Sequence, residues 1–391
     1  MAALTGVRVV EFTNMITGPV AGCMLADLGA DIVKIENPKG GDLFRTFRGG
    51  LYSPYFQSYN RNKRSLTLDL RSDKGREIAI DLVKRADILI ENFRPGVMDR
   101  LGLGLEAMQK LNPKLIYCSI TGFGADGPYK DRPAYDAVAQ AISGLSSLFL
   151  NPEAPQITGP TISDNMTGIY ACYGIMGALV ERQRTGKGRL IEVNMLEATI
   201  AFFPDPWGNW TQLGIVPGPL MRVSASQSHA LKCADGKLMS VHLSSQEKFW
   251  SGCCEALHCE RLMADPRFDS RPKRIENYVA LGAEFRKAAV TKPRAYWMER
   301  LEKNDVPFAP VHSLSEVFDD PQVQHLDTFA EMHHPTEGKI TAIRRPVWID
   351  GSRDDQPLKP APVLGEQTDE VLAELGFGKD KIAELRKEGV V

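Results

Sequence analysis

A single acidic residue at the start of a long helical pattern is the best candidate for a chemically active group in this sequence. Residues 159–168 read GPTISDNMTG, and Asp164 falls where a helix is expected to begin. Backbone N–H groups at a helix N-terminus favour a negative charge there. Most Asp residues in such positions are N-caps. A carboxylate can also act as a nucleophile toward an activated acyl group.

The glycines of this helix favour a functional role for Asp164. Apolar residues recur at helical spacing after it, and a basic turn followed by Gly186 ends the pattern. Gly168, Gly174 and Gly177 lie within the helix, and each costs about 1 kcal/mol relative to alanine. Close approach of another backbone or of a ligand would offset that cost. Asp164 is therefore predicted to be the catalytic nucleophile.

The bulk composition is that of an ordinary globular protein with two domains. A chain of 391 residues is too long for one ordinary core. A net charge of −2 gives no broad field for nucleic acid or for a membrane surface. No apolar run is long enough to cross a membrane, and no signal peptide is recognisable. We expect a soluble, cytoplasmic protein that binds neither nucleic acid nor membranes.

Seven cysteines raise the question of a metal site. Cys253, Cys254 and Cys259 lie close to His258 in the sequence. Adjacent cysteines match no usual zinc spacing, and the apolar residues around Cys253 recur as one face of a helix. Cysteines of a hydrophobic core in a reducing compartment are the preferred interpretation. We expect no metal.

The first 36 residues predict a βαβ unit. Residues 7–12 and 31–36 are apolar strands with a helix at 20–28 between them, which implies a parallel sheet. Glu36 could then bind a ribose, as in dinucleotide-binding folds. However, the loop of residues 13–19 contains one glycine in place of the Gly-x-Gly-x-x-Gly fingerprint. The architecture is predicted to be Rossmann-like, without a site for NAD.

Polar side chains follow the later strands of the predicted sheet. Those strands are expected at residues 66–70, 88–91, 115–120 and 190–194. Arg71, Arg94 and Arg100 lie just past or near strand ends. Asn92 and Phe93 are placed to contact a base or an extended ligand chain. A single arginine is usually a solvated surface residue, but ligands bind beyond the carboxyl ends of parallel strands, so the group predicts a phosphate site.

The composition changes after residue 200, where prolines and tryptophans become frequent. We interpret residues 201–224 as an irregular linker and residues 225–314 as a smaller α+β domain. Residues 315–330 are expected to form a second linker in extended conformation. Residues 331–391 then end in a pair of helices.

Motifs along nearly the whole chain resemble those of the class III coenzyme A transferases, the CaiB/BaiF family. They are Glu11-Phe12, Gly18-Pro19, LGADIVKIE at 28–36, NKRS at 62–65, ENFRPG at 91–96, Ala134-Tyr135-Asp136, TGKG at 185–188 and PVLGEQT at 362–368. The resemblance implies a large Rossmann-like domain formed by residues 1–200 together with 331–391. It also implies a homodimer of interlocked rings.

The same resemblance implies roles for individual residues. Asp164 takes the position of the catalytic aspartate of the family. The residues expected to bind CoA or the acyl group are Met15, Ile16, Thr17, Arg71, Asn92, Phe93, Arg94, Arg100, Leu101 and Tyr135. Coenzyme A would be a substrate and product, and no cofactor would be bound permanently.

Departures from the family pattern narrow the expected reaction. Racemase members carry a His base where this chain has Tyr135, which favours a transferase. Ile16 replaces a glutamine of members that act on formyl-CoA and oxalate, and residues 224–229 replace their four-glycine loop. Asn37 replaces an arginine that some members have after the second strand. The chain is therefore not expected to use the formyl-CoA and oxalate pair.

The predicted reaction moves CoA between an acyl-CoA and an acceptor carboxylic acid through an Asp164 anhydride and an Asp164–CoA thioester. Binding energy from the remote part of CoA would position the sulfur. An acyl-CoA racemase or epimerase and a non-catalytic CoA-ester-binding paralogue are the alternatives. Arg222 or His229 would suit a dicarboxylate, although a structural role explains each of them more readily.

Overall fold

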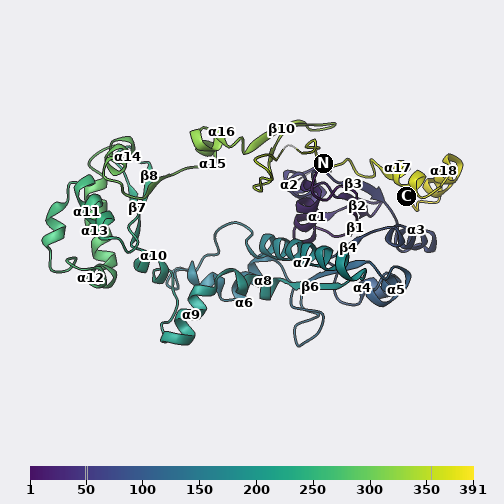
Figure 1. Cartoon of the computed structure of the whole chain (residues 1–391), viewed down its shortest axis with the longest axis horizontal. Helices are drawn as coiled ribbons and strands as arrows, with labels where there is room; N and C mark the ends of the chain where they lie inside the picture. Colours follow the sequence, from purple (N-terminus) through teal and green to yellow (C-terminus); the bar gives the residue numbers. More distant parts are fainter. Residues whose placement is uncertain (49, 51, 354) are drawn as a thin grey trace. The chain divides into compact units, whose positions relative to one another are not determined.

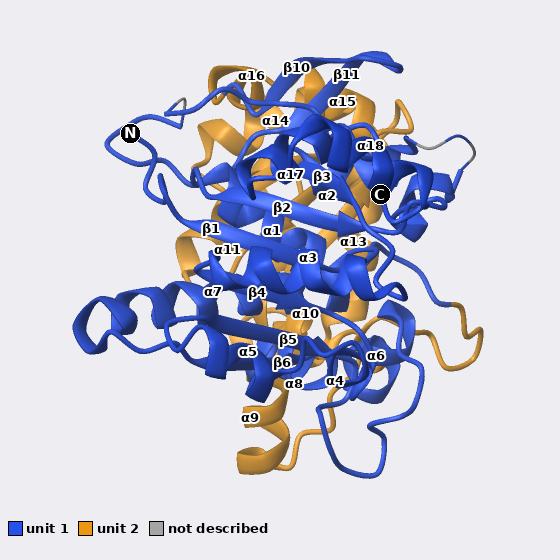
Figure 2. Cartoon of the chain, turned by 90° about the vertical axis from the view of Figure 1, so that its right-hand side faces the viewer, with its two compact units in different colours: residues 1–146, 157–204, 327–391 blue, residues 147–156, 205–326 orange. Residues whose placement is uncertain are grey.

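The structure, a computed structural model, describes residues 1–48, 50, 52–353 and 355–391. The chain forms two compact units (Figure 2). Unit 1 comprises residues 1–146, 157–204 and 327–391, and unit 2 comprises residues 147–156 and 205–326. Both chain ends therefore belong to unit 1, and the middle of the sequence forms most of unit 2.

Unit 1 is built on a six-stranded parallel sheet. The strands are β1 (Arg8–Phe12), β2 (Asp31–Glu36), β3 (Arg64–Thr67), β4 (Ile88–Glu91), β5 (Ile116–Thr121) and β6 (Leu190–Asn194). They follow the order β3-β2-β1-β4-β5-β6, and every neighbouring pair is parallel. The predicted α/β class with a Rossmann-like sheet is confirmed. The strand order reverses between β1 and β4, where open α/β sheets bind their ligands.

Helices cover both faces of this sheet, which explains why its central strands are apolar on both sides. One face carries α1 (Thr17–Asp27) and α7 (Ser163–Thr185). The other carries α3 (Asp73–Lys84), α5 (Leu105–Leu111), α17 (Thr368–Glu374) and α18 (Lys379–Lys387). The C-terminal helix α17 lies beside β3 (Figure 1), where the Thr67 N–H donates to Thr368 Oγ1 at 3.2 Å.

Two glycines let α7 pack closely against its neighbours. A Cβ on Gly168 would lie 2.6 Å from the Thr17 carbonyl oxygen, and a Cβ on Gly174 would lie 2.8 Å from Ile191 Cγ2. The predicted close approach of another backbone is confirmed at Gly168, where the neighbour is α1, whereas the neighbour of Gly174 is a side chain. Gly177 has no atom within 4 Å of such a Cβ, so packing does not account for it.

The remaining elements of unit 1 are short. They are η1 (Leu43–Thr46), α2 (Pro54–Asn60), α4 (Val97–Arg100), α6 (Asp136–Ile142), α8 (Met195–Phe202) and the hairpin of β10 (Phe329–His334) and β11 (Gly338–Ile343). The 3-10 helix η2 (Leu145–Leu148) follows α6. In the described part of the chain, no helix has the length and apolar character needed to cross a membrane.

Unit 2 contains a three-stranded antiparallel sheet of β7 (Ser228–Lys232), β8 (Leu238–His242) and β9 (Phe308–Val311). The helices of this unit include α11 (Glu247–Ala256), η3 (Glu260–Ala264), α12 (Arg271–Glu276), α13 (Tyr278–Ala289) and α14 (Arg294–Lys303). Cys253, Cys254 and Cys259 are buried in the core of this unit, as predicted. No group of three or more His, Cys, Asp or Glu side chains among the described residues is arranged to hold a metal ion.

The two stretches expected to be irregular or extended are largely helical. The first contains α9 (Pro204–Leu213) and α10 (Met221–Ser226), and the second contains α15 (Leu314–Phe318) and α16 (Pro321–His325). Pro204 and Pro321 are the first residues of their helices. A first-turn N–H has no intrahelical partner, so proline is tolerated there. The prediction of irregular structure was wrong where prolines begin helices, at Pro204 and Pro321, whereas Pro217 and Pro219 lie in the connection between α9 and α10.

Candidate active site

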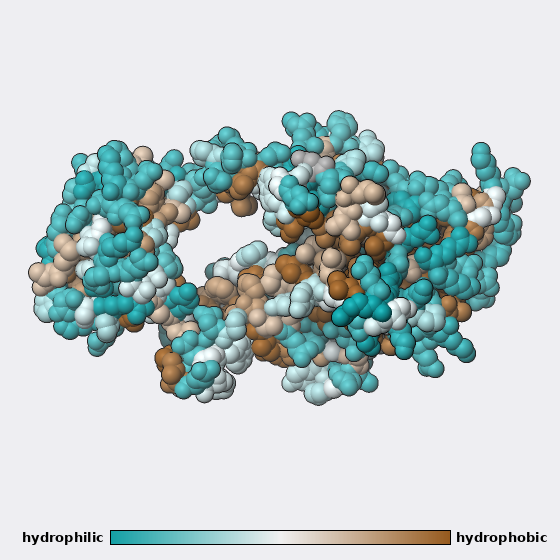
Figure 3. All heavy atoms as spheres, in the orientation of Figure 1, coloured by the Kyte–Doolittle hydropathy of each residue, from teal (hydrophilic) through white to brown (hydrophobic). Residues whose placement is uncertain are grey.

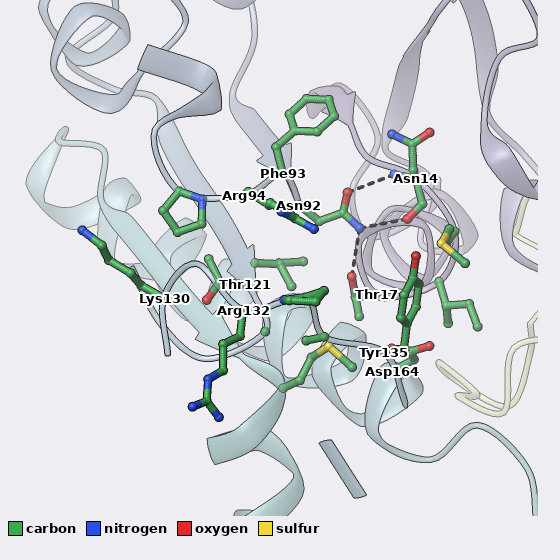
Figure 4. A pocket seen from close by; sticks show the side chains of 18 of the residues that line it. Asn14, Thr17, Asn92, Phe93, Arg94, Thr121, Lys130, Arg132, Tyr135 and Asp164 are labelled. Atoms are coloured by element: carbon green, nitrogen blue, oxygen red, sulfur yellow. Dashed lines mark hydrogen bonds between the residues drawn. The ribbon is translucent and has the colours of Figure 1, made fainter. Parts of the chain in front are cut away.

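A cavity of about 430 Å³ lies at the carboxyl ends of the central strands of unit 1 (Figure 4). Asn14 follows β1, Asn92 follows β4, and Thr121 ends β5. The cavity therefore occupies the crevice where the strand order reverses, which is the position expected for a ligand site in this architecture.

Most of the predicted site residues line this cavity. They are Met15, Ile16, Thr17, Asn92, Phe93, Arg94, Tyr135 and Asp164. Residues from four separate segments of the sequence are thus brought to one place. The structure shows their proximity, and their individual roles stay predictions.

Arg71, Arg100 and Leu101 do not line the cavity. The Arg71 side chain is 72% exposed and forms an ion pair with Asp69 (2.9 Å). Arg100 is exposed at the end of α4. Leu101 packs against the apolar core beneath α3 and α5. The sequence pattern placed Arg71 and Arg100 near strand ends without giving the direction of their side chains, and Leu101 was named from the family resemblance.

Asn92 locks the loop after β1 to the loop after β4 (Figure 4). Its Oδ1 accepts the Asn14 N–H (2.9 Å), and its Nδ2 donates to the Asn14 carbonyl (2.8 Å). Nδ2 also donates to Thr17 Oγ1 (3.0 Å). All the polar atoms of the Asn92 side chain are therefore used within the protein. These hydrogen bonds hold the two loops together at the cavity wall.

The N-terminus of α1 forms one wall of the cavity. Ile16 is the N-cap residue and makes no side-chain capping bond, and both Ile16 and Thr17 line the cavity. The first N–H groups of a helix have no intrahelical partner and carry partial positive charge. This wall is suited to a carbonyl oxygen that becomes negative during a reaction.

Asp164 is not the N-cap of α7. The N-cap is Ile162, and Asp164 is the second residue of the helix. Its backbone N–H donates to Asp136 Oδ1 (3.2 Å), while its own carboxylate accepts no hydrogen bond from any residue that the structure describes. The N-cap interpretation is therefore excluded. The carboxylate is free to contact a ligand in the cavity.

The environment of Asp164 favours its protonated form. Partial burial and the negative charge of Asp136 raise the pKa of the Asp164 carboxyl to about 7. Burial removes water that would solvate the Asp164 anion, and the Asp136 carboxylate repels it. Perturbed carboxyl groups in a cavity are typical of catalytic sites.

Lys130 and Arg132 are cavity residues that the sequence analysis missed. In Figure 4 they lie on the other side of the pocket from Tyr135 and Asp164. The Arg132 guanidinium also stacks over the Tyr129 ring, 3.8 Å from its centroid. Together with Arg94 they make that side of the cavity basic. Their position between the glycine-rich loop 121–128 and Tyr135 was the available signal.

Glu91 is a second titratable group that the sequence analysis quoted without a role. It is 5% exposed at the end of β4, and its Oε2 accepts the Phe93 N–H (2.9 Å). Burial raises the pKa of Glu91 to about 7, and the nearby charge of Asp99 adds to the effect. Glu91 faces a smaller cavity of about 230 Å³ that adjoins the turn of residues 92–95.

Comparison with known proteins defines the class of protein. The chain belongs to CoA-transferase family III, whose pattern matches residues 4–368. The resemblance noted in the sequence is therefore confirmed. The match covers the segments that contribute the cavity.

Named relatives specify the kind of enzyme. The chain is similar to the formyl-CoA:oxalate CoA-transferase of Bradyrhizobium diazoefficiens, with 33% identity over 100% of this chain and 97% of the relative. It is also similar to the succinyl-CoA:glutarate CoA-transferase of Mus musculus, with 33% identity over 100% of this chain and 91% of the relative. The protein is thus an enzyme of the CoA-transferase type, and the racemase alternative is not favoured.

Solved structures of the same fold agree with this assignment. A CaiB/BaiF family protein from Brucella suis matches with a TM-score of 0.83 and 32% identity, covering 96% of this chain and 99% of the other. A protein from Mycobacterium tuberculosis matches with a TM-score of 0.82 and 31% identity, covering 95% and 99%. The agreement extends over both units of the chain.

Proposed function

We propose that this enzyme transfers CoA from an acyl-CoA thioester to a carboxylic acid, with Asp164 as the nucleophile. The observation that carries the proposal is the free carboxylate of Asp164 in the wall of the cavity. The transferase names of the relatives support the reaction class. A carboxylate is sufficient for this chemistry, because the thioester bond is exchanged and its energy is conserved.

The reaction proceeds by successive exchanges at three carbonyl carbons, those of the donor acyl group, of Asp164 and of the acceptor. An oxygen of Asp164 attacks the donor thioester, the C–S bond breaks, and CoA thiolate leaves an aspartyl–acyl anhydride. The thiolate then attacks the Asp164 carbonyl, which releases the donor acid and forms an Asp164–CoA thioester. The acceptor carboxylate opens that thioester to a new anhydride, and the thiolate attacks the acceptor acyl carbon. The products are a new acyl-CoA and free Asp164.

Two features of the cavity support this course. The basic side formed by Arg94, Lys130 and Arg132 suits the phosphates of CoA, which keep the thiolate near Asp164 between steps. The α1 N-terminus at Ile16 and Thr17 suits the oxyanion of each tetrahedral intermediate. Phe93 offers an apolar surface to the pantetheine chain or the base.

The roles of Arg71, Arg100 and Leu101 in holding CoA rest on the family resemblance alone. Arg71 and Arg100 are exposed, where a nucleotide extending from the cavity along the protein surface would contact them. We expect replacement of either arginine by alanine to raise the KM for acyl-CoA and to leave kcat unchanged. The packed side chain of Leu101 would act through the shape of α4.

Neither residue considered for a dicarboxylate is well suited to that role. His229 is buried, and burial with the nearby Arg286 lowers its pKa to about 4, so it is neutral at physiological pH. The exposed Arg222 is 3.4 Å from Asp205, which offsets its charge. The proposal therefore names carboxylic acids as a class.

The proposal includes a homodimer and a cytoplasmic location. Ile169, Tyr173 and Val180 form an apolar row on α7 and are 39%, 76% and 59% exposed. Figure 3 shows apolar residues gathered on the surface over α6 and α7. A second copy of the chain would cover this face. All seven cysteines are free and buried, which suits a reducing compartment.

The function is tested by incubating the protein with a panel of acyl-CoA donors and organic acids and following new acyl-CoA species by mass spectrometry. The panel includes the pairs used by the named relatives. Asp164→Asn is expected to abolish transfer, while the matched variant Asp205→Asn in α9 retains it. Transfer that persists in Asp164→Asn would contradict the proposal.

A further inference from the structure

A row of four buried charged side chains lies beneath the loop after β1, residues 13–15, which forms part of the cavity wall. Lys63, Glu11, Lys34 and Asp42 have side chains that are 0% exposed. Glu11 forms ion pairs with Lys63 and Lys34 at 2.9 Å each, and Lys34 forms an ion pair with Asp42 at 2.9 Å. The charges alternate in sign and sum to zero. Gly22 of α1 leaves room for this row, because a Cβ there would lie 1.9 Å from Glu11 Oε2.

This network bonds directly to the loop after β1. Thr13 Oγ1 donates to Glu11 Oε1 (2.7 Å), and Lys34 Nζ donates to the Thr13 carbonyl (2.8 Å). The Met15 N–H donates to Asp42 Oδ1 (3.0 Å). Asn92 holds the intervening residue from the cavity side. Each residue from 13 to 15 is therefore anchored through its backbone.

Met15 is the strained point of this loop. Its φ of +66° lies in the left-handed region, which non-glycine residues rarely adopt. Such a conformation persists only when surrounding contacts enforce it, and it is concentrated at functional sites. Ile16 and Thr17, the two residues that follow, begin α1 and line the cavity. A relaxed Met15 would redirect both of them.

Stability alone is a weak explanation for four buried charges. Replacing a buried ionic cluster by apolar residues of similar volume is often neutral or stabilising. Asp42 uses one oxygen for two backbone N–H groups, those of Met15 and Phe44, and the other faces Lys34. A side chain with a single acceptor could not meet both demands.

We propose that Asp42, oriented by Lys34, is a positioning residue that holds Met15 in its left-handed conformation and so aims the N-terminus of α1 at the reacting carbonyl. The kinetic part of this inference rests on the proposed transferase function. The structural part, the dependence of the loop on Asp42, does not. Asp42 acts through Met15 and touches no cavity ligand itself.

A double-mutant cycle in the full-length enzyme separates positioning from general stability. Asp42→Ala is expected to lower kcat about tenfold when residue 15 is methionine. In a Met15→Gly background the same change should lower kcat less than threefold, because glycine populates positive φ without strain. Equal losses in the two backgrounds would overturn the proposal. If Asp42→Ala fails to fold, the cycle is run with Asp42→Leu, which has a similar shape and also removes the oxygen that accepts the Met15 N–H, and it is judged by the same criterion.

A control and a second readout complete the test. Asp27→Asn removes another buried carboxylate, paired with Arg61 at the far end of α1, and is expected to lower Tm without changing kcat. Hydrogen exchange of the peptide spanning residues 13–18 should rise in Asp42→Ala and not in Asp27→Asn. Unchanged exchange in Asp42→Ala would also overturn the proposal. If the parent protein has no transferase activity but exchange still rises in Asp42→Ala, the proposed function is refuted and the positioning role of Asp42 stands.

Discussion

At the scale of single residues, the proposed mechanism depends on a carboxylate, Asp164, whose anionic form is destabilised by its surroundings. Asp164 lies beside Asp136, is partly buried, and has a pKa of about 7. The helix N-terminus partly offsets this cost. An anion with few stabilising contacts retains its reactivity toward a carbonyl carbon, and at neutral pH about half of the molecules would carry it.

The influence of Asp136 can be measured in a pH profile. Asp136→Asn keeps an oxygen that accepts the Asp164 N–H and removes the neighbouring negative charge. The pKa of Asp164 should fall, so the acid limb of the kcat/KM profile, expected near pH 7, should move to lower pH. Activity at pH 6 relative to pH 8 should then rise several-fold. An acid limb that stays in place would show that Asp136 does not control Asp164.

The raised pKa also predicts how Asp164 affects stability. Its folded-state pKa of about 7 exceeds the ordinary value of 3.8, so the folded state binds more protons between these values and loses stability as pH rises through them. Asp164→Asn lacks this loss. Its Tm should exceed that of the parent by a few degrees at pH 8 and differ little at pH 4. Equal Tm differences at both pH values would contradict the assigned pKa.

Residue types and local position were sufficient to select Asp164 and Asn92 as candidate site residues, whereas Met15 was selected from the family resemblance. Each of these follows or begins an element whose pattern is clear in the sequence. Lys130 and Arg132 were missed because a loop of irregular backbone gives no periodicity from which side-chain direction can be read. For the same reason, the sequence did not show that the Arg71 side chain points away from the cavity.

At the scale of elements, the contact between α1 and α7 brings Asp164, the proposed nucleophile, close to the α1 N-terminus, the proposed oxyanion site. Gly168 permits this contact, since a Cβ there would lie 2.6 Å from the Thr17 carbonyl oxygen and from Val20 Cβ. Close approach at the glycines of α7 was predicted only from the helix stability that each glycine loses relative to alanine. It could not identify the partner helix.

Two glycine substitutions in α7 test this contact against a matched control. Gly168→Ala should lower the free energy of unfolding by about 1–3 kcal/mol because the helices must separate, and it should also reduce kcat. In the single chain Gly177→Ala meets no atom within 4 Å, so in the monomeric protein it should stabilise by about 0.5–1 kcal/mol through helix propensity. Denaturant unfolding of both variants measures the difference. A neutral Gly168→Ala would contradict the packing account.

At the scale of the whole molecule, the parallel sheet decides where the site forms. The apolar strands predicted this sheet, because strands covered on both faces carry apolar side chains on both sides. The pairing of β1 with β4, which creates the crevice, links residues about eighty positions apart and has no local signal. The proline-rich stretches were misjudged because position within a helix, not proline content, decides whether proline is tolerated.

The apolar face of α7 gives a prediction for assembly. Tyr173→Glu combined with Val180→Glu should shift the protein from dimer to monomer, because both side chains are exposed in the single chain. Leu111→Glu, an exposed leucine at the end of α5, should leave the mass unchanged. Light scattering coupled to size-exclusion chromatography reports the mass. A monomeric parent protein would refute the proposed dimer.

The most direct test of the account asks whether the Asp164 carboxylate becomes covalently modified during turnover. The enzyme is incubated with a donor acyl-CoA, quenched with hydroxylamine or borohydride, and digested for peptide mapping. We predict a modified residue in the peptide that contains Asp164, dependent on acyl-CoA and absent from Asp164→Asn. An active preparation in which Asp164 remains unmodified, or in which another residue carries the label, would contradict the central claim.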